Sequence, residues 1–236
     1  MKGMKFYMEF LVVAIFSIIS IFMLFFIFSV NMKKLKDMTN IKELDDISNK
    51  YPSNIEICKE YLKNLKNENV QIEENKDSDA TVYIAVTNKI SIGNLRNSYT
   101  RIQTIAHECL HSIQNRKILL FNFIFSNIYL LYFFVVLVLS VFGKLQNQMT
   151  YVAILAILGV IYLVVRMYLE DDAMIKARYL AKEYLEEKNI SEKEQIDKLV
   201  KQYDVVNDLG IRCVHYQLFL SVLSKVAILS LICFWR

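Results

Sequence analysis

The sequence predicts a mainly α-helical integral membrane protein with four transmembrane helices, two large polar segments and a small β element. The chain has 236 residues, of which 55% are hydrophobic, and it contains a single proline and five glycines. Four apolar stretches each approach the roughly 20 residues that a helix needs to cross a bilayer. Because an ordinary soluble domain of this length is less apolar, we expect a multi-pass membrane protein.

The four predicted spans differ in the residues that border them. We expect the first to be retained as an anchor, because Asn31 to Lys36 follow it where a cleaved signal would need small residues. A short polar turn, residues 143–148, joins the second and third spans as a helical hairpin. The fourth contains Lys225, whose ammonium must snorkel, pair or face a protein interior. The predicted spans are residues 10–30, 118–142, 151–167 and 216–234.

Basic residues near the span ends indicate the orientation of the chain. They gather on one side of the predicted membrane, and the positive-inside rule makes that side cytoplasmic. The segments 31–117 and 168–213 are then cytoplasmic, and both termini are external. The basic residues of the cytoplasmic side are Lys33, Lys34, Lys36, Arg116, Lys117, Arg166, Lys176, Arg178 and Arg212, and those of the other side are Lys2, Lys5, Lys144 and Arg236.

The net charge of the chain is small, at +4. Lysines mix with acidic residues through the polar segments and do not line an aromatic-rich face. We therefore expect the lipid bilayer as a partner and no nucleic acid.

The polar segments contain helical and β patterns. Three capping-box pairs precede runs of helical apolar spacing and predict amphipathic helices. Residues 81–86 are rich in β-branched side chains, and we expect Val70 to Ile72 to pair with them across the polar turn 73–80. Residues 97–114 predict a helix that leads directly into the second span, and 171–187 continue the third span. The capping-box pairs are Asn40 with Glu43, Ser53 with Glu56, and Ser191 with Glu194.

A metal-binding pattern lies in the predicted helix before the second span. Residues 104–114 contain H-E-x-x-H, which places His107 and His111 one helical turn apart on one face, where they would bind a zinc ion together. Glu108 would act as general base towards a water that attacks a carbonyl group. The pattern predicts a zinc-dependent metallopeptidase that acts on peptides or proteins. The alternative is a chance match on an ordinary amphipathic helix.

A catalytic zinc site usually has three protein ligands and one open position. Glu170 is the candidate for the third ligand, because the second and third spans leave the membrane face that carries His107 and return to it. The alternative is that Glu170, Asp171 and Asp172 form only a solvated acidic cap at the membrane surface.

These two motifs resemble those of the YugP-like family of bacterial membrane zinc metallopeptidases, in which H-E-x-G-H-A-[IL]-Q is followed, after a transmembrane hairpin, by E-F-D-A-S-R-R-A. The resemblance covers roughly residues 80–220 and implies a cytoplasmic helical domain of the zincin type. It also implies that Glu170 is the third zinc ligand and that Asp172 orients a ligating histidine. The matching residues are His107, Glu108, His111, Ile113, Gln114, Glu170, Asp172, Ala173 and Ala177.

The sequence departs from the family pattern at some positions. Leu110 stands where the family has glycine, and Met174 to Lys176 replace S-R-R. The heat-shock and prenyl-protein-processing proteases have E-x-x-A-D at the second motif, and Met174 occupies that aspartate position, so they fit less well. Frequent lysine, isoleucine and asparagine suggest a bacterial source of low GC content.

Further residues are candidates for contacts with a substrate. His215, with Arg212 on the same helix face, is a candidate donor to the oxyanion, and packing at the membrane interface is the alternative role. The strand Thr81, Val82, Tyr83 and Ile84 is a candidate to pair with an extended substrate backbone, and a purely structural hairpin is its alternative.

Two other functions remain open from the sequence. A non-catalytic membrane adaptor would keep a zincin fold and use its helices to bind a partner, but the intact Glu108 favours an enzyme. A channel or transporter component is suggested by Lys225 within a span.

Overall fold

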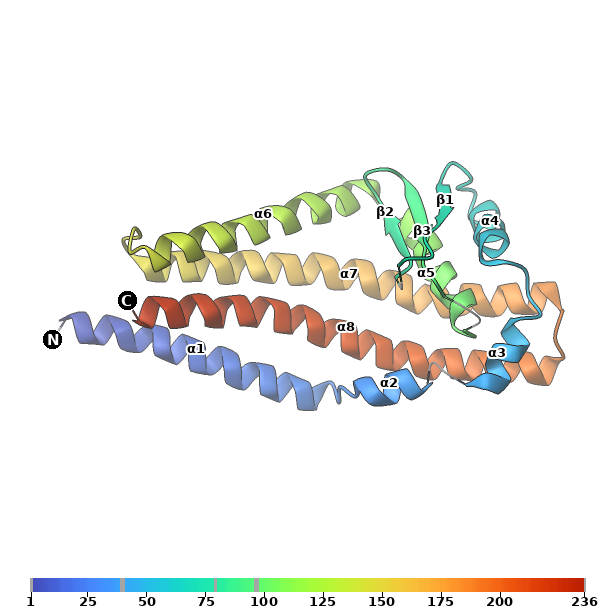
Figure 1. Ribbon diagram of the computed structural model, residues 1–236, viewed down its shortest axis with the longest axis horizontal. Helices are drawn as coiled ribbons and strands as arrows, with labels where there is room; N and C mark the ends of the chain where they lie inside the picture. The colour runs from blue at the N-terminus through green and yellow to red at the C-terminus, as the bar shows by residue number, and fades with distance from the viewer. Residues whose placement is uncertain (1, 39–40, 79, 96–97, 236) are drawn as a thin grey trace. The chain divides into compact units, whose positions relative to one another are not determined.

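The computed structural model describes residues 2–38, 41–78, 80–95 and 98–235, and these residues are mostly helical (Figure 1). Eight helices and one three-stranded sheet lie within the described ranges. The helices are α1 (Lys2–Ile27), α2 (Met32–Met38), α3 (Lys42–Ser48), α4 (Asn54–Asn64), α5 (Arg101–Ile113), α6 (Arg116–Val141), α7 (Gln148–Lys188) and α8 (Lys193–Trp235). The strands are β1 (Gln71–Glu74), β2 (Val82–Ile84) and β3 (Lys89–Ile92).

Four helices are long and apolar enough to cross a membrane, as the sequence predicted. They are Met8–Ile27 of α1, together with α6, α7 and α8. Helices α7 and α8 have 41 and 43 residues, about twice the length that a bilayer requires. Each therefore continues as a polar helix beyond its apolar part.

The chain forms two compact units, and α7 and α8 contribute to both. The first unit comprises Met1–Val30, Phe121–Tyr168 and Arg212–Arg236, and the second comprises Asn31–Leu120 and Leu169–Ile211.

The first unit is apolar on its outer surface as well as inside. Phe16, Phe26 and Leu131 are each more than 60% exposed, whereas Leu155 and Leu229 are fully buried. A helix that is hydrophobic on all sides is typical of a membrane span. The first unit therefore has the surface expected of a bundle in lipid.

The sheet of the second unit has the strand order β1-β3-β2, with β1 parallel and β2 antiparallel to β3. The predicted pairing of Val70 to Ile72 with residues 81–86 is therefore wrong, because β3 lies between these two segments. Ile90 and Ile92 are two residues apart on β3, so their side chains lie on the same face of the sheet, and both are fully buried. Their burial favours the central position for this strand. The sheet packs on α5 (Figure 1).

The predicted helix starts and ends were correct only in part. The capping box at Ser53 is formed, with the Ser53 N–H donating to Glu56 Oε2 at 2.9 Å. Asn40 and Asn97 lie outside the described residues. Helix α8 begins at Lys193, so Ser191 stands one residue before the capping position. The helix predicted over 97–114 is α5, and it leads into α6 through a short break, because α5 ends at Ile113 and Gln114 is extended (φ −65°, ψ 162°).

Arg101, the first residue of α5, fixes this helix to the segment between α3 and α4. The side chain is 5% exposed and uses all five of its N–H groups. Its acceptors are Ser48 Oγ (3.1 Å), Ser48 O (2.7 Å), Tyr51 O (3.0 Å), Pro52 O (2.8 Å) and Asn54 Oδ1 (2.9 Å). No other side chain supplies five donors in a fixed planar fork.

We predict that Arg101→Met destabilises the second unit by about 3 kcal/mol or more, because five hydrogen bonds are lost and the buried Tyr51 carbonyl group loses its Arg101 donor. Thiol labelling in urea, located by mass spectrometry, would measure this loss, since Cys58 and Cys109 are fully buried. The control is Arg178→Met, which removes a partly exposed pair with Asp204 at 3.4 Å and should cost at most about 1 kcal/mol. Equal labelling of the two variants would contradict the prediction.

Candidate metal centre

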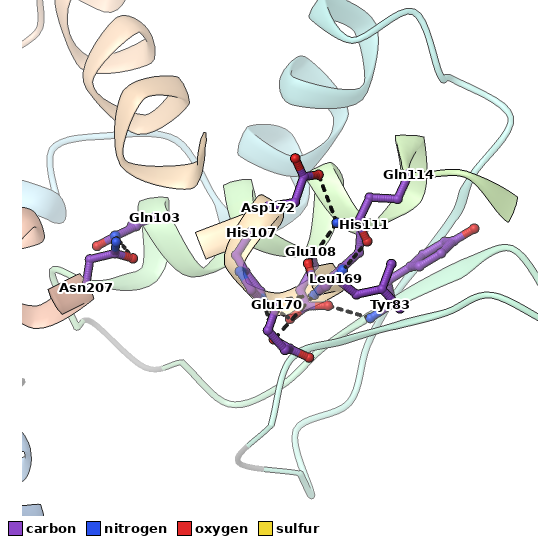
Figure 2. A network of polar contacts seen from close by, with 10 residues as sticks. All are labelled: Tyr83, Gln103, His107, Glu108, His111, Gln114, Leu169, Glu170, Asp172 and Asn207. Atoms are coloured by element: carbon purple, nitrogen blue, oxygen red, sulfur yellow. Dashed lines mark hydrogen bonds and ion pairs between the residues drawn. The ribbon is translucent and has the colours of Figure 1, made fainter. Parts of the chain in front are cut away.

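Three donor atoms from α5 and α7 come together in the second unit (Figure 2). The Nε2 atoms of His107 and His111 lie 3.0 Å apart. Glu170 Oε2 lies 3.5 Å from His107 Nε2 and 3.7 Å from His111 Nε2. His111 and Glu170 are buried, and the His107 side chain is 18% exposed. These three residues form a group that could hold a metal ion.

The helical period explains why the two histidines meet, but it does not explain the position of Glu170. Positions 107 and 111 are one turn apart on α5, and their rings meet edge to face with centroids 4.5 Å apart. Glu170 lies on α7, and it reaches the two imidazoles only because α7 packs beside α5. The side chain of Glu170 is only 10% exposed. Glu170 is therefore not part of a solvated acidic cap.

The donor set fits a divalent metal ion. Ligands in a tetrahedral zinc site lie about 2.1 Å from the ion and therefore about 3.4 Å from one another. The three observed distances, 3.0, 3.5 and 3.7 Å, lie around this value. Two imidazoles and one carboxylate are also a ligand set found in catalytic zinc sites.

Gln114 fixes the orientation and tautomer of His111. Its Nε2 donates to Leu169 O at 2.8 Å and to Asp172 Oδ2 at 3.0 Å, and both atoms can only accept (Figure 2). The amide oxygen must therefore face His111 Nδ1, which lies 2.8 Å from it. Nδ1 consequently carries the proton, and the lone pair of His111 Nε2 points towards His107 and Glu170.

The role of Asp172 in orienting a ligating histidine stays a prediction, and the structure connects Asp172 to His111 through Gln114. In the described part of the chain, its carboxylate bonds with Gln114 and with Lys176, one turn further along α7. Asp172 is thus connected to His111 through the amide of Gln114 and does not bond to a ligating imidazole itself.

Gln114 received no role from the sequence, although it belongs to the matched motif. It lies three residues after His111, a spacing that places two side chains on one helix face but does not predict a contact with α7. The end of α5 at Ile113 gives Gln114 an extended backbone, and from there its side chain reaches α7. The helical periodicity of the sequence did not predict this helix end, and so it did not predict the contact of Gln114 with α7.

Glu108 lies beside the three donors. Its Oε1 is 3.8 Å from His107 Nε2, and its Oε2 accepts a hydrogen bond from the Tyr83 N–H at 2.6 Å (Figure 2). Burial raises the pKa of Glu108, although the charges of His107 and His111 and the Tyr83 N–H act in the opposite direction. For His111, burial alone would lower the pKa, but the nearby carboxylates of Glu170 and Glu108 raise it overall.

The predicted substrate strand corresponds to β2 and the residue before it. Val82, Tyr83 and Ile84 lie opposite Ser91, Ile90 and Lys89 of β3, and β2 is an edge strand. The Tyr83 N–H points away from β3 towards Glu108. Thr81 Oγ1 accepts from the Gly93 N–H at 3.0 Å. The segment 81–84 therefore lies next to Glu108, and its predicted pairing with a substrate stays a prediction.

Arg212 and His215 belong to the first unit. The His215 ring there lies edge-on to Phe28, with centroids 6.0 Å apart. Their role as oxyanion donors stays a prediction.

Comparison of the chain with protein-family models, curated proteins and solved structures gave no match.

We predict that the purified protein binds about one metal ion per chain and that Glu170→Ala binds markedly less, because two imidazoles alone are an incomplete ligand set. Elemental analysis of the detergent-solubilised protein would measure the metal content. The control is Glu183→Ala, since Glu183 is an exposed residue of the same helix. A folded wild-type protein without affinity for zinc would contradict the prediction and favour the adaptor alternative.

Gln114→Leu should lower metal affinity by about 10- to 100-fold, because His111 loses the acceptor that fixes its tautomer. Gln114→Glu should lie between wild type and Gln114→Leu, since it keeps an acceptor for His111 but loses both donors to α7. Competition with a chromogenic chelator would rank the variants. Gln103→Leu is the control, because this buried glutamine of α5 bonds to Asn207 at 3.2 Å and not to a donor of the metal group. Equal affinities for all four proteins would refute the role of Gln114.

Proposed function

We propose that the protein is a zinc-dependent metallopeptidase of the cell membrane, with its four apolar helices crossing the bilayer. The observation that carries this proposal is the buried carboxylate of Glu108 beside a group of two histidines and one glutamate. The resemblance of both motifs to the YugP-like metallopeptidases, which have a zincin-type domain, supports the same function. The chain would then be a bacterial membrane protease.

His107, His111 and Glu170 would hold the metal. Imidazole nitrogens with one carboxylate suit zinc, and three protein ligands leave a position for water or substrate. When bound, zinc polarises the scissile carbonyl group and makes water acidic enough to act as a nucleophile near neutral pH.

Glu108 would carry the proton during hydrolysis. Its Oε1, the oxygen nearer to His107, would accept the proton of the attacking water. The same carboxyl group would then deliver the proton to the departing amide nitrogen, so that an amine leaves. The hydrogen bond from the Tyr83 N–H holds Oε2 and leaves Oε1 directed towards the metal group.

The edge strand β2 would hold the substrate. A peptide in extended conformation can pair with an exposed strand edge through main-chain hydrogen bonds, which tolerates many side-chain sequences. Because Tyr83 is bonded to Glu108, a peptide on this edge would lie close to the general base. Suitable substrates are cytoplasmic loops of membrane proteins or short peptides near the lipid surface.

The distribution of basic residues supports a cytoplasmic active site. Lys33, Lys34, Arg116 and Lys117 border the polar segment that contains α5, as expected for the cytoplasmic side of a membrane.

Glu108→Gln should reduce the cleavage of an unstructured protein such as casein by about 100-fold or more while metal content is unchanged, because the amide cannot accept the proton. Cleavage and metal content would be measured on the same zinc-loaded samples. Glu183→Gln, on the exposed face of α7, is the matched control and should cleave at the wild-type rate. Undiminished cleavage by a zinc-loaded Glu108→Gln variant would exclude Glu108 as the general base.

A further inference from the structure

A single charged residue occupies the middle of the last predicted span. Lys225 lies at the centre of residues 216–234. Across the four predicted spans the only other charged residue is Arg166, next to the end of the third, and the spans contain no aspartate or glutamate. These four predicted spans therefore supply no carboxylate for Lys225.

The contacts of Lys225 lie within the first unit. Its Nζ donates to Ser221 Oγ at 2.6 Å and to Ser221 O at 3.0 Å, one turn earlier on α8. It also lies 5.3 Å from the ring centroid of Tyr129 on α6. Both hydrogen bonds are thus made to one neutral residue, and the ring offers only the weak attraction of its face.

The Tyr129 ring is held in place by close packing. Tyr129 is 2% exposed, and a Cβ added at Gly159 of α7 would lie 3.1 Å from its hydroxyl oxygen and 2.5 Å from Val222 Cγ1. The Tyr129 hydroxyl therefore lies close to Gly159 of α7. Lys225 itself is only partly buried.

The hydrogen bonds to Ser221 hold the ammonium of Lys225 within the predicted span. The bonds to Ser221 place Nζ about one helical turn, roughly 6 Å, from the level of Lys225 towards the N-terminal end of α8. The centre of a bilayer lies about 15 Å from the polar interface. A lysine at this depth is costly, and such residues usually pair with an opposite charge or mark a functional site.

We propose that Lys225 is a recognition site for a second membrane protein, whose transmembrane helix carries an aspartate or glutamate at mid-bilayer depth. The partner carboxylate would accept the remaining N–H of Lys225 at the surface formed by Tyr129 and Ser221. A second copy of this chain has no such carboxylate in its spans, and lipid phosphates lie at the interface. This inference rests on the proposed membrane insertion and not on peptide hydrolysis.

The test uses the full chain in phosphatidylcholine vesicles and three synthetic leucine-alanine transmembrane helices. The first helix has aspartate at its centre, the second has leucine there, and the third has aspartate one turn from its end. Energy transfer between a dye on the helix and a dye on the protein measures binding. We expect the central aspartate to bind about tenfold more tightly than leucine, and more tightly than the terminal aspartate.

Substitutions assign the effect to Lys225. Lys225→Met should remove the preference for the central aspartate, whereas Lys144→Met should keep it, because Lys144 is an exposed residue between α6 and α7. A wild-type protein without the preference, or a preference that survives Lys225→Met, would overturn the proposal. So would full competition by added phosphatidylglycerol, which would indicate a lipid site, or self-association that depends on Lys225, which would indicate a second copy.

Membrane insertion is checked separately by alkaline extraction. Release of the wild-type protein from the vesicles would overturn both the membrane assignment and this inference. Retention of the protein without any preference for aspartate would overturn this inference alone. Neither result depends on whether the protein cleaves casein.

Discussion

The contact between the end of α5 and α7 is the constraint on which the candidate metal centre depends. At this contact Glu170 meets both histidines, and the amide of Gln114 joins His111 to the Leu169 carbonyl group and to Asp172. A buried amide or carbonyl group without a partner costs about 1–3 kcal/mol, so a shift of α7 along α5 would be unfavourable at several atoms together. The same hydrogen bonds that hold the helices together therefore set the position of the third donor.

The rest of the second unit supports α5 at its other end and on its side. Arg101 ties the first residue of the helix to the segment between α3 and α4 through five hydrogen bonds, and the Tyr83 N–H of β2 holds Glu108. A site for metal chemistry needs ligands whose orientation is fixed before the ion binds, since otherwise binding must also order the side chains. Buried polar contacts at both ends of α5 meet this need.

The two units meet different physical requirements. The second unit buries tyrosines and polar groups around one core, whereas the first exposes large apolar side chains and keeps few polar atoms. In hydrocarbon an apolar outer surface carries no penalty, but each charge becomes costly. Lys225 is therefore a more informative residue within its span than any of the many lysines of the polar segments.

The sequence by itself determined the features that follow from local spacing. The apolar stretches determined the four membrane-capable helices, the four-residue interval placed His107 and His111 on one face, and Ser53 with Glu56 began α4. Only the tertiary structure decided that β3 separates β1 from β2, that α5 ends before Gln114, and that Asp172 bonds to Gln114. The sequence could propose Glu170 as a third donor, but only packing could bring it to 3.5 Å from His107. Hydrophobic periodicity and composition describe neighbours along one helix or strand. Contacts between distant segments depend on how the whole chain buries its apolar surfaces and pairs its polar groups.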